Sequence, residues 1–134
     1  MALFLLDTDI CSYAMKRRSP PLQTRLIDFA PGELKVSVIT VFELRFGACR
    51  SPESERIWAI ISAFLSNVEI LNFDQQAAQH AASIRAELEK SGQKIGSYDL
   101  LIAAHARAAG ATVITNNVRE FGRVAGLAVE NWTE

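Results

Sequence analysis

The chain alternates two kinds of hydrophobic pattern along its length. Short and mostly apolar runs, which are typical of strands buried on both faces of a sheet, recur five times. They cover residues 2–7, 35–39, 68–73, 111–115 and 127–132. Between them, apolar residues return every three or four positions, which predicts amphipathic helices. These helices are expected over residues 9–16, 22–30, 40–50, 52–68, 74–90 and from Ser97 or Asp99 to Gly110.

This alternation predicts a three-layer α/β fold, in which helices flank a mainly parallel five-stranded sheet. A length of 134 residues fits one domain. No linker, repeat or low-complexity segment divides the chain. We therefore expect residues 1–134 to form a single domain whose ligand site lies outside the carboxyl ends of the strands.

Several residues are typical of helix ends. Thr8 is placed to cap the first helix. Thr40 is followed by Glu43 at the spacing of a capping box, which predicts that a helix begins there. Asp74 is expected to cap the helix over residues 74–90, and Gly110 to close the next one.

Composition and charge exclude several classes of protein. Apolar residues make up 49% of the chain and charged residues 22%, which excludes disordered and collagen-like proteins. The net charge is −1, so any surface for nucleic acid must be local. No membrane span or signal peptide is recognisable, and we expect a cytoplasmic protein. Cys11 and Cys49 are expected to be buried, unpaired thiols.

Acidic side chains fall beside the ends of the predicted strands. Asp7 ends the first strand, Glu43 lies in the first turn of the helix after the second strand, and Asp99 opens the helix before the fourth strand. The fourth strand leads into a polar segment that contains Thr115, Asn116, Asn117 and Glu120. Since parallel strands present their carboxyl ends at one edge, we expect these side chains to converge there.

Carboxylates that converge in apolar surroundings repel one another, which raises their pKa values. A divalent cation bound between them removes this repulsion. Oxygen ligands without a nearby His or Cys favour Mg²⁺ or Mn²⁺ over Zn²⁺. Such an ion activates water and stabilises charge on phosphoryl oxygens. The pattern therefore indicates phosphate chemistry.

Each acid also has a purely structural interpretation. Asp7 can simply terminate its strand, and Asp9 can interact with the helix dipole. Glu43 can serve only the capping box, and Asp99 can be an ordinary N-cap. Their shared position at one edge is what favours a metal site.

Three stretches carry a resemblance to a known family: "LLDTDICSY", "VSVITVFELRFGA" and "IRAELEKSGQKIGSYDLLIAAHARAAGATVITNNVREFGRVAGLAVENW". In this order and spacing, the chain resembles PIN-domain ribonucleases, and specifically the VapC toxins of VapBC toxin–antitoxin modules, over nearly its whole length. The resemblance implies a PIN fold with parallel strands in the order 3-2-1-4-5. It also implies Mg²⁺- or Mn²⁺-dependent endoribonuclease activity, dimerisation, and inhibition by a VapB antitoxin in a larger hetero-oligomer. Members with the pattern "TNN…REF" resemble toxins that cut initiator tRNA in the anticodon loop.

The resemblance also implies the catalytic residues, which carry over to Asp7, Glu43 and Asp99. The family often has a fourth acid where this chain has Asn117, so a complete second metal site is in doubt. Glu120, three residues further on, is expected to supply the missing carboxylate directly or through water.

Our hypothesis is that Asp7 and Asp99 bind Mg²⁺ directly, while Glu43 binds it or orients a water. The side chains expected to hold waters or ligands in place are those of Thr8, Thr115, Asn116 and Asn117. The side chains expected to contact RNA are those of Lys16, Arg17, Lys94, Tyr98 and Arg119, with Arg18 and Arg123 as further basic candidates.

Other residues have simpler expected roles. His80 and His105 lie in predicted helices and are interpreted as surface or core residues, not as general bases. Arg45 is a candidate partner for an acid or for the antitoxin. The aromatic residues of the third and fourth helices belong to the core by default, although a groove between these helices could accept an antitoxin segment.

Two rival functions have distinct signatures. Asp7-Thr8-Asp9 also resembles the start of haloacid-dehalogenase-like phosphatases, with Asp7 as nucleophile, although the later pair of acids is missing. A trapped aspartyl-phosphate would favour this class. The other rival is a PIN-like module that binds RNA or protein without cutting, which metal binding without nuclease activity would favour.

Overall fold

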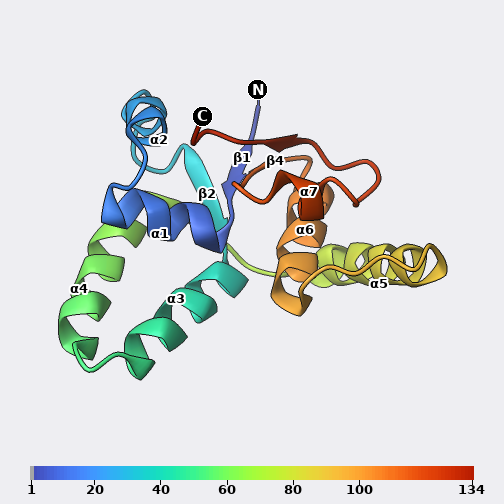
Figure 1. The fold of residues 1–134 in the computed structure, drawn as a ribbon, viewed down its shortest axis with the longest axis horizontal. Helices are drawn as coiled ribbons and strands as arrows, with labels where there is room; N and C mark the ends of the chain where they lie inside the picture. Colours follow the sequence, from blue (N-terminus) through green and yellow to red (C-terminus); the bar gives the residue numbers. More distant parts are fainter. Residues whose placement is uncertain (1) are drawn as a thin grey trace.

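The computed structural model describes residues 2–134 and shows five parallel strands in one sheet (Figure 1). The strand order is β3-β2-β1-β4-β5, which confirms the expected PIN arrangement. The strands are β1 (Phe4–Leu6), β2 (Leu34–Ser37), β3 (Glu69–Leu71), β4 (Thr112–Ile114) and β5 (Val129–Glu130). All four strand pairings are parallel, so the carboxyl ends share one edge of the sheet.

Within residues 2–134, seven helices accompany the sheet (Figure 1). They are α1 (Thr8–Lys16), α2 (Pro20–Leu26), α3 (Val38–Arg50), α4 (Ser54–Leu65), α5 (Gln75–Lys90), α6 (Ser97–Ala109) and α7 (Val118–Phe121). None of them is long and apolar enough to cross a membrane. Six of the seven were predicted; α7 was not, because four residues are too few to show a period.

Consecutive residues of β1 explain why the strand is continuously apolar. Leu5 and Leu6 are both fully buried, and they point to opposite faces of the sheet. Leu5 packs into the core beneath α5 and α6, whereas Leu6 packs into the core beneath α1 and α4. Val113 and Ile114 of β4 divide in the same way. The sheet is therefore the middle of three layers (Figure 1).

Several expected helix ends were wrong, and each has a local cause. Asp7, not Thr8, caps α1, because its carboxylate accepts the Ile10 N–H at 2.8 Å. Ser37 caps α3, so this helix begins earlier than the capping-box spacing indicated. Thr40 consequently lies buried in the first turn of α3.

Two further boundaries differ from the expected ones. α2 begins at Pro20, since Ser19 caps it and prolines are tolerated in the first turn. The helix expected over residues 52–68 is limited to Ser54–Leu65. Asp74 and Gly110 act as expected, and Gly110 adopts the left-handed conformation with φ of 68°. The prediction for Cys49 was wrong: both thiols are unpaired, but only Cys11 is buried.

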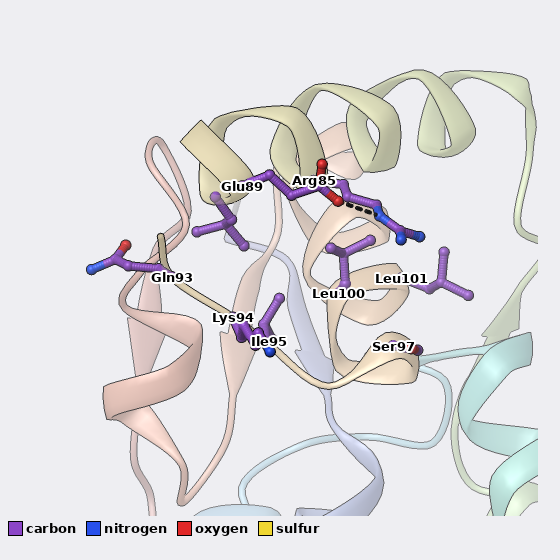
Figure 2. Close-up of a pocket in the computed structure, with 9 residues that line it drawn as sticks. Arg85, Glu89, Gln93, Lys94, Ile95, Ser97, Leu100 and Leu101 are labelled. Atoms are coloured by element: carbon purple, nitrogen blue, oxygen red, sulfur yellow. Dashed lines mark hydrogen bonds and ion pairs between the residues drawn. The ribbon is translucent and has the colours of Figure 1, made fainter. Parts of the chain in front are cut away.

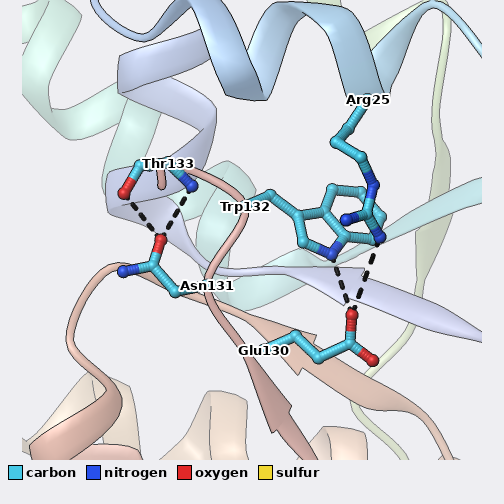
Figure 3. A network of polar contacts seen from close by, with 5 residues as sticks. All are labelled: Arg25, Glu130, Asn131, Trp132 and Thr133. Atoms are coloured by element: carbon cyan, nitrogen blue, oxygen red, sulfur yellow. Dashed lines mark hydrogen bonds and ion pairs between the residues drawn. The ribbon is translucent and has the colours of Figure 1, made fainter.

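The carboxyl-terminal segment is anchored by Trp132 (Figure 3). Its ring, only 1% exposed, packs against Phe4 and Phe29 with centroids 5.1 and 5.5 Å away. The Arg25 guanidinium stacks on it at 4.5 Å, and the indole N–H donates to Glu130 at 2.9 Å. This cluster fixes β5 against β4, and β4 leads into the polar segment with the candidate site residues.

Trp132→Ala is expected to lower the free energy of unfolding by about 3–5 kcal/mol, because it leaves a cavity in the core. Urea unfolding followed by circular dichroism measures the loss. The matched control is Trp58→Ala, since Trp58 is 44% exposed and should cost about 1 kcal/mol or less. Equal losses in the two variants would contradict the anchoring role.

Candidate active site

Asp7 is a buried acid at the junction of β1 and α1. Its backbone N–H donates to the Ile114 carbonyl of β4, and its side chain is 2% exposed. Burial raises its pKa to about 6, despite the Ile10 N–H and the nearby Thr115 hydroxyl, which lower it. The negative charges of Asp9 and Glu43 raise it further. Capping of α1 therefore offsets only part of the free-energy cost of burying the Asp7 carboxylate.

Glu43 reaches the same edge from the second turn of α3. The Thr8 hydroxyl donates to Glu43 Oε1 at 2.7 Å, and it also lies 3.0 Å from the Thr40 hydroxyl. The two threonines thus fix Glu43 across the contact between α1 and α3. The capping-box interpretation of Glu43 was wrong, since Ser37 caps this helix.

Asp99 is the third residue of α6, and Gly96 is the N-cap residue. The N-cap interpretation of Asp99 was therefore wrong. Burial raises the pKa of Asp99 to about 7, and the charges of Glu120, Asp7 and Glu43 add to this rise. Four carboxyl groups from four separate elements consequently lie within electrostatic reach of one another.

Glu120 of α7 is the fourth acid, and hydrogen bonds hold both of its oxygens. The Gly96 N–H donates to Oε1 at 2.7 Å, and the Asn117 amide donates to Oε2 at 2.9 Å. Burial raises the pKa of Glu120, but these donors, the neighbouring Asp99 and the Arg123 charge lower it more strongly. Glu120 is thus the ionised partner beside Asp99.

The polar segment after β4 is ordered by its own contacts. The Thr115 hydroxyl accepts the Asn117 N–H at 2.9 Å and lies beside Asp7. Thr115 is fully buried, and Asn117 is half-buried. Asn116 is also half-buried, and no hydrogen bond from its side chain to an acid is seen within residues 2–134. The structure therefore brings Thr8, Thr115 and Asn117 to the acids and leaves Asn116 beside them.

The donor set suits a hard divalent cation. Across the described chain, no three His, Cys, Asp or Glu side chains lie close enough to hold one ion as they stand. Mg²⁺ does not need such a cage, because it keeps several waters and binds through one or two carboxylates. Burial is the main cause of the raised pKa values of Asp7 and Asp99, and neighbouring negative charges add to it. A bound cation would offset both effects by favouring the ionised carboxylates.

The basic residues named from the sequence divide into two groups. Lys16 and Arg17 lie at the far end of α1 from Asp7, about 13 Å along the helix axis. Lys94 and Arg119 are exposed on the loop before α6 and on α7, which both adjoin Glu120. The elements that carry the second group adjoin Glu120, although the Lys94 side chain also lines the pocket between α5 and α6. The charge of Arg123, a further basic candidate, lowers the pKa of Glu120.

Tyr98 precedes Asp99 and is 46% exposed. Its ring meets that of Phe42 at 5.4 Å, and Phe42 directly precedes Glu43 and is 50% exposed. Sequence reasoning missed Phe42 and Gly96. The only signal for Phe42 was its place beside an acid, and none existed for Gly96.

A cavity of about 390 Å³ lies between α5, the following loop and the start of α6. Its lining residues are drawn in Figure 2. Ser97, Leu100 and Leu101 line it from α6, and Lys94 from the loop. Asp99 is not among its lining residues. This cavity therefore lies on another face of α6 from the acids.

The remaining candidates have structural roles. His105 is buried, its Nδ1 lies 2.8 Å from the Ser37 hydroxyl, and burial lowers its pKa. His80 accepts a hydrogen bond from Arg107 at 2.9 Å. Arg45 stacks on Trp58 at 4.1 Å, so it joins α3 to α4 and pairs with no acid in the part described.

Comparison with known proteins agrees with this arrangement. The sequence model of the PIN domain matches residues 4–127. The chain is 41% identical to the tRNA(fMet)-specific endonuclease VapC of Shigella flexneri, with 99% of this chain and all of that protein covered. It is 46% identical to the ribonuclease VapC2 of Haemophilus influenzae, over 98% of this chain and 99% of that protein.

The chain belongs to the VapC ribonucleases of the PIN-domain family. Its fold is also similar to the toxin–antitoxin structure described as DNA-bound VapBC from Salmonella typhimurium. The TM-score is 0.93 at 40% identity, with 98% of this chain and 99% of that chain covered. This membership excludes the interpretation of Asp7 as the nucleophile of a haloacid-dehalogenase-like phosphatase. Asp9, which would be the general acid in such an enzyme, is exposed.

The raised pKa of Asp99 has a consequence for stability. Between its ordinary value of 3.8 and about 7, the carboxyl binds more protons in the folded state than in the unfolded state. The free energy of unfolding of the metal-free protein should therefore fall as the pH rises through this range. Asp99→Asn should raise the free energy of unfolding by about 1 kcal/mol at about pH 8 and leave it unchanged near pH 4. The expected gain is small because solvent partly screens this half-buried group.

Urea unfolding in EDTA at several pH values measures this difference. The exposed Asp28→Asn is the control for loss of one negative charge. A gain at Asp99 that is independent of pH would contradict the electrostatic origin.

Proposed function

We propose that the protein is a Mg²⁺- or Mn²⁺-dependent endoribonuclease toxin that hydrolyses RNA phosphodiesters and is restrained by a VapB-type antitoxin. The observation that carries the proposal is the convergence of Asp7, Glu43, Asp99 and Glu120 at the carboxyl edge of the sheet. The raised pKa values of Asp7 and Asp99 support it, since acids perturbed first by burial and then by neighbouring charge are typical of functional sites.

Each acid has a role that follows from its contacts. Asp7 and Asp99 would hold the ion, and both must lose their protons to do so. When bound, Mg²⁺ supplies charge neutralisation on the phosphoryl oxygens and lowers the pKa of a water. Glu43 receives the Thr8 hydroxyl on Oε1, so its other oxygen is free to bind or orient the attacking water. Thr115 keeps the segment after β4 in place beside Asp7.

RNA would reach this site over α7 and the loop before α6, where Lys94, Arg119 and Arg123 would supply positive charge and Tyr98 an exposed ring. We infer that the substrate is a tRNA, with the initiator tRNA anticodon loop as the preferred target. The name of the Shigella relative, which is tRNA(fMet)-specific, supports this choice. Lys16 and Arg17 would contact only more distant parts of a long RNA.

The antitoxin would occupy the exposed apolar face of α3 and α4. Phe46 of α3 and Trp58 of α4 are 52% and 44% exposed, which is unusual for large apolar side chains. Ile60, 41% exposed, lies on another side of α4, because it is two residues from Trp58 on a helix of 3.6 residues per turn. Relatives in VapBC complexes support this partner. We also propose that the protein is a homodimer, forms a larger hetero-oligomer with the antitoxin, and acts in the cytoplasm.

Cleavage assays test the proposal directly. With Mg²⁺, the purified protein should cut initiator tRNA faster than elongator methionine tRNA, and EDTA should stop the reaction. Asp7→Ala and Asp99→Asn should each reduce kcat by at least about 100-fold, because loss of a ligand weakens both ion and geometry. Asp28→Asn is the charge-matched control and should keep wild-type turnover.

Wild-type turnover from Asp99→Asn would rule out its assignment. If the wild-type protein binds Mg²⁺ and RNA but cuts no RNA, the non-catalytic binding module is the better description.

Tyr98→Ala is expected to raise KM for RNA by roughly 10-fold, since a base stacked on an aromatic ring contributes about 1–3 kcal/mol. Tyr98→Phe keeps the ring and should keep the wild-type KM. Steady-state cleavage of a short RNA measures both values. An unchanged KM in the alanine variant would show that the ring serves packing against Phe42 only.

A further inference from the structure

The start of α6 lacks the kind of cap that other helices in the structure have. The side chains of Asp7, Ser37 and Asp74 cap α1, α3 and α5, whereas Gly96 at the N-cap of α6 has no side chain to offer. The backbone of Gly96, with φ of −56° and ψ of 146°, is open to any residue. Glycine is therefore not required there by backbone conformation.

Asp99 occupies the third position of this helix, which in a capping box holds the acid that bonds the N-cap N–H. In this structure Glu120, 24 residues further along the chain, accepts that N–H at 2.7 Å. Both acids adjoin Gly96: a Cβ placed there would lie 3.5 Å from Glu120 Oε1 and 3.6 Å from Asp99 Oδ2. Two carboxylates thus stand beside one donor, and Glu120 takes it.

Asn117 decides which way Glu120 points. Its amide donates to Glu120 Oε2 at 2.9 Å, and its own N–H is held by the Thr115 hydroxyl at 2.9 Å. A continuous line of hydrogen bonds therefore runs from the end of β4 through α7 to the start of α6. An aspartate at position 117 could not donate this bond and would repel Glu120.

We infer that Asn117 and Glu120 form a positioning pair that occupies the Gly96 N–H and so keeps Asp99 out of a local capping box, with its carboxyl held beside Glu120 and available to the metal. This inference rests on the proposed nuclease function, and it assigns Glu120 a role other than that of a metal ligand. Without the pair, Asp99 is the nearest acid that can close a local capping box, and it would turn away from the site.

A swap of the two side chains tests the pair. Asn117→Asp places two carboxylates together, and Glu120→Gln offers an amide that can accept from only one of the two donors. The double variant N117D/E120Q restores both bonds, since the glutamine oxygen can accept from Gly96 and its amide can donate to the new carboxylate. The negative charge is kept but moved by three residues.

We expect each single variant to lower kcat by roughly 10- to 100-fold, with KM for RNA changed less than about 3-fold. The double variant should recover to within about 10-fold of the wild type. Asn67→Asp, at an exposed position beyond the opposite end of the sheet, is the matched control and should match the wild type. Thermal unfolding in EDTA verifies that every variant is folded.

The Gly96 amide gives a readout that does not depend on activity. Its proton resonance and exchange rate, measured by NMR without metal, should change in Asn117→Asp and return towards wild type in the double variant. A double variant that is folded but no more active than the singles would overturn the inference and make Glu120 a direct ligand. An unchanged Gly96 amide in Asn117→Asp would also overturn it, even if the wild-type protein cleaved no RNA.

Discussion

Desolvation of carboxyl groups that also repel one another is the constraint around which this molecule is arranged. Asp7 is 2% exposed at the end of a strand that is apolar on both faces, and its pKa is raised to about 6. Three more acids approach the same edge from α3, α6 and α7. Such an arrangement is costly for folding, and the parallel sheet maintains it because its mostly buried central strands, β1, β2 and β4, fix the positions of their carboxyl ends.

The four acids accept different numbers of hydrogen bonds, and this difference indicates different roles for them. Glu120 has donors on both oxygens, and Glu43 has Thr8 on one. The Asp7 carboxylate accepts a backbone N–H, which orients it without neutralising it. The partner of Asp99 is another acid, because its carboxyl shares a hydrogen bond with Glu120. Burial first, and then the charges of Glu120, Asp7 and Glu43, raise the pKa of Asp99 to about 7. The least satisfied acid is thus the one that gains most from a cation.

Much of the fold could be predicted because strands buried on both faces leave a clear trace. Leu5 and Leu6 belong to opposite cores, so neither position tolerates a polar residue, and the same holds for Val113 and Ile114. Helix starts were harder. Thr40 and Glu43 have the spacing of a capping box, yet Ser37 caps the helix from three residues earlier, and only tertiary contacts reveal that Thr8 binds Glu43 instead.

The part of the site that could not be predicted is the part that depends on distant contacts. Asp7, Glu43 and Asp99 were found from their places beside strand ends, because a parallel sheet gathers those ends by topology alone. The bond between Glu120 and Gly96 spans 24 residues and joins α7 to the start of α6, and no sequence periodicity indicates it. Lys16 and Arg17 show the converse effect: a basic run close in sequence to Asp7 lies at the far end of α1, so its contact with RNA stays a prediction. Each residue of a helix adds about 1.5 Å along the helix axis, so residues that are close in sequence can lie far apart in space. The residues of a functional surface are therefore better sought at neighbouring strand ends than along one stretch of the chain.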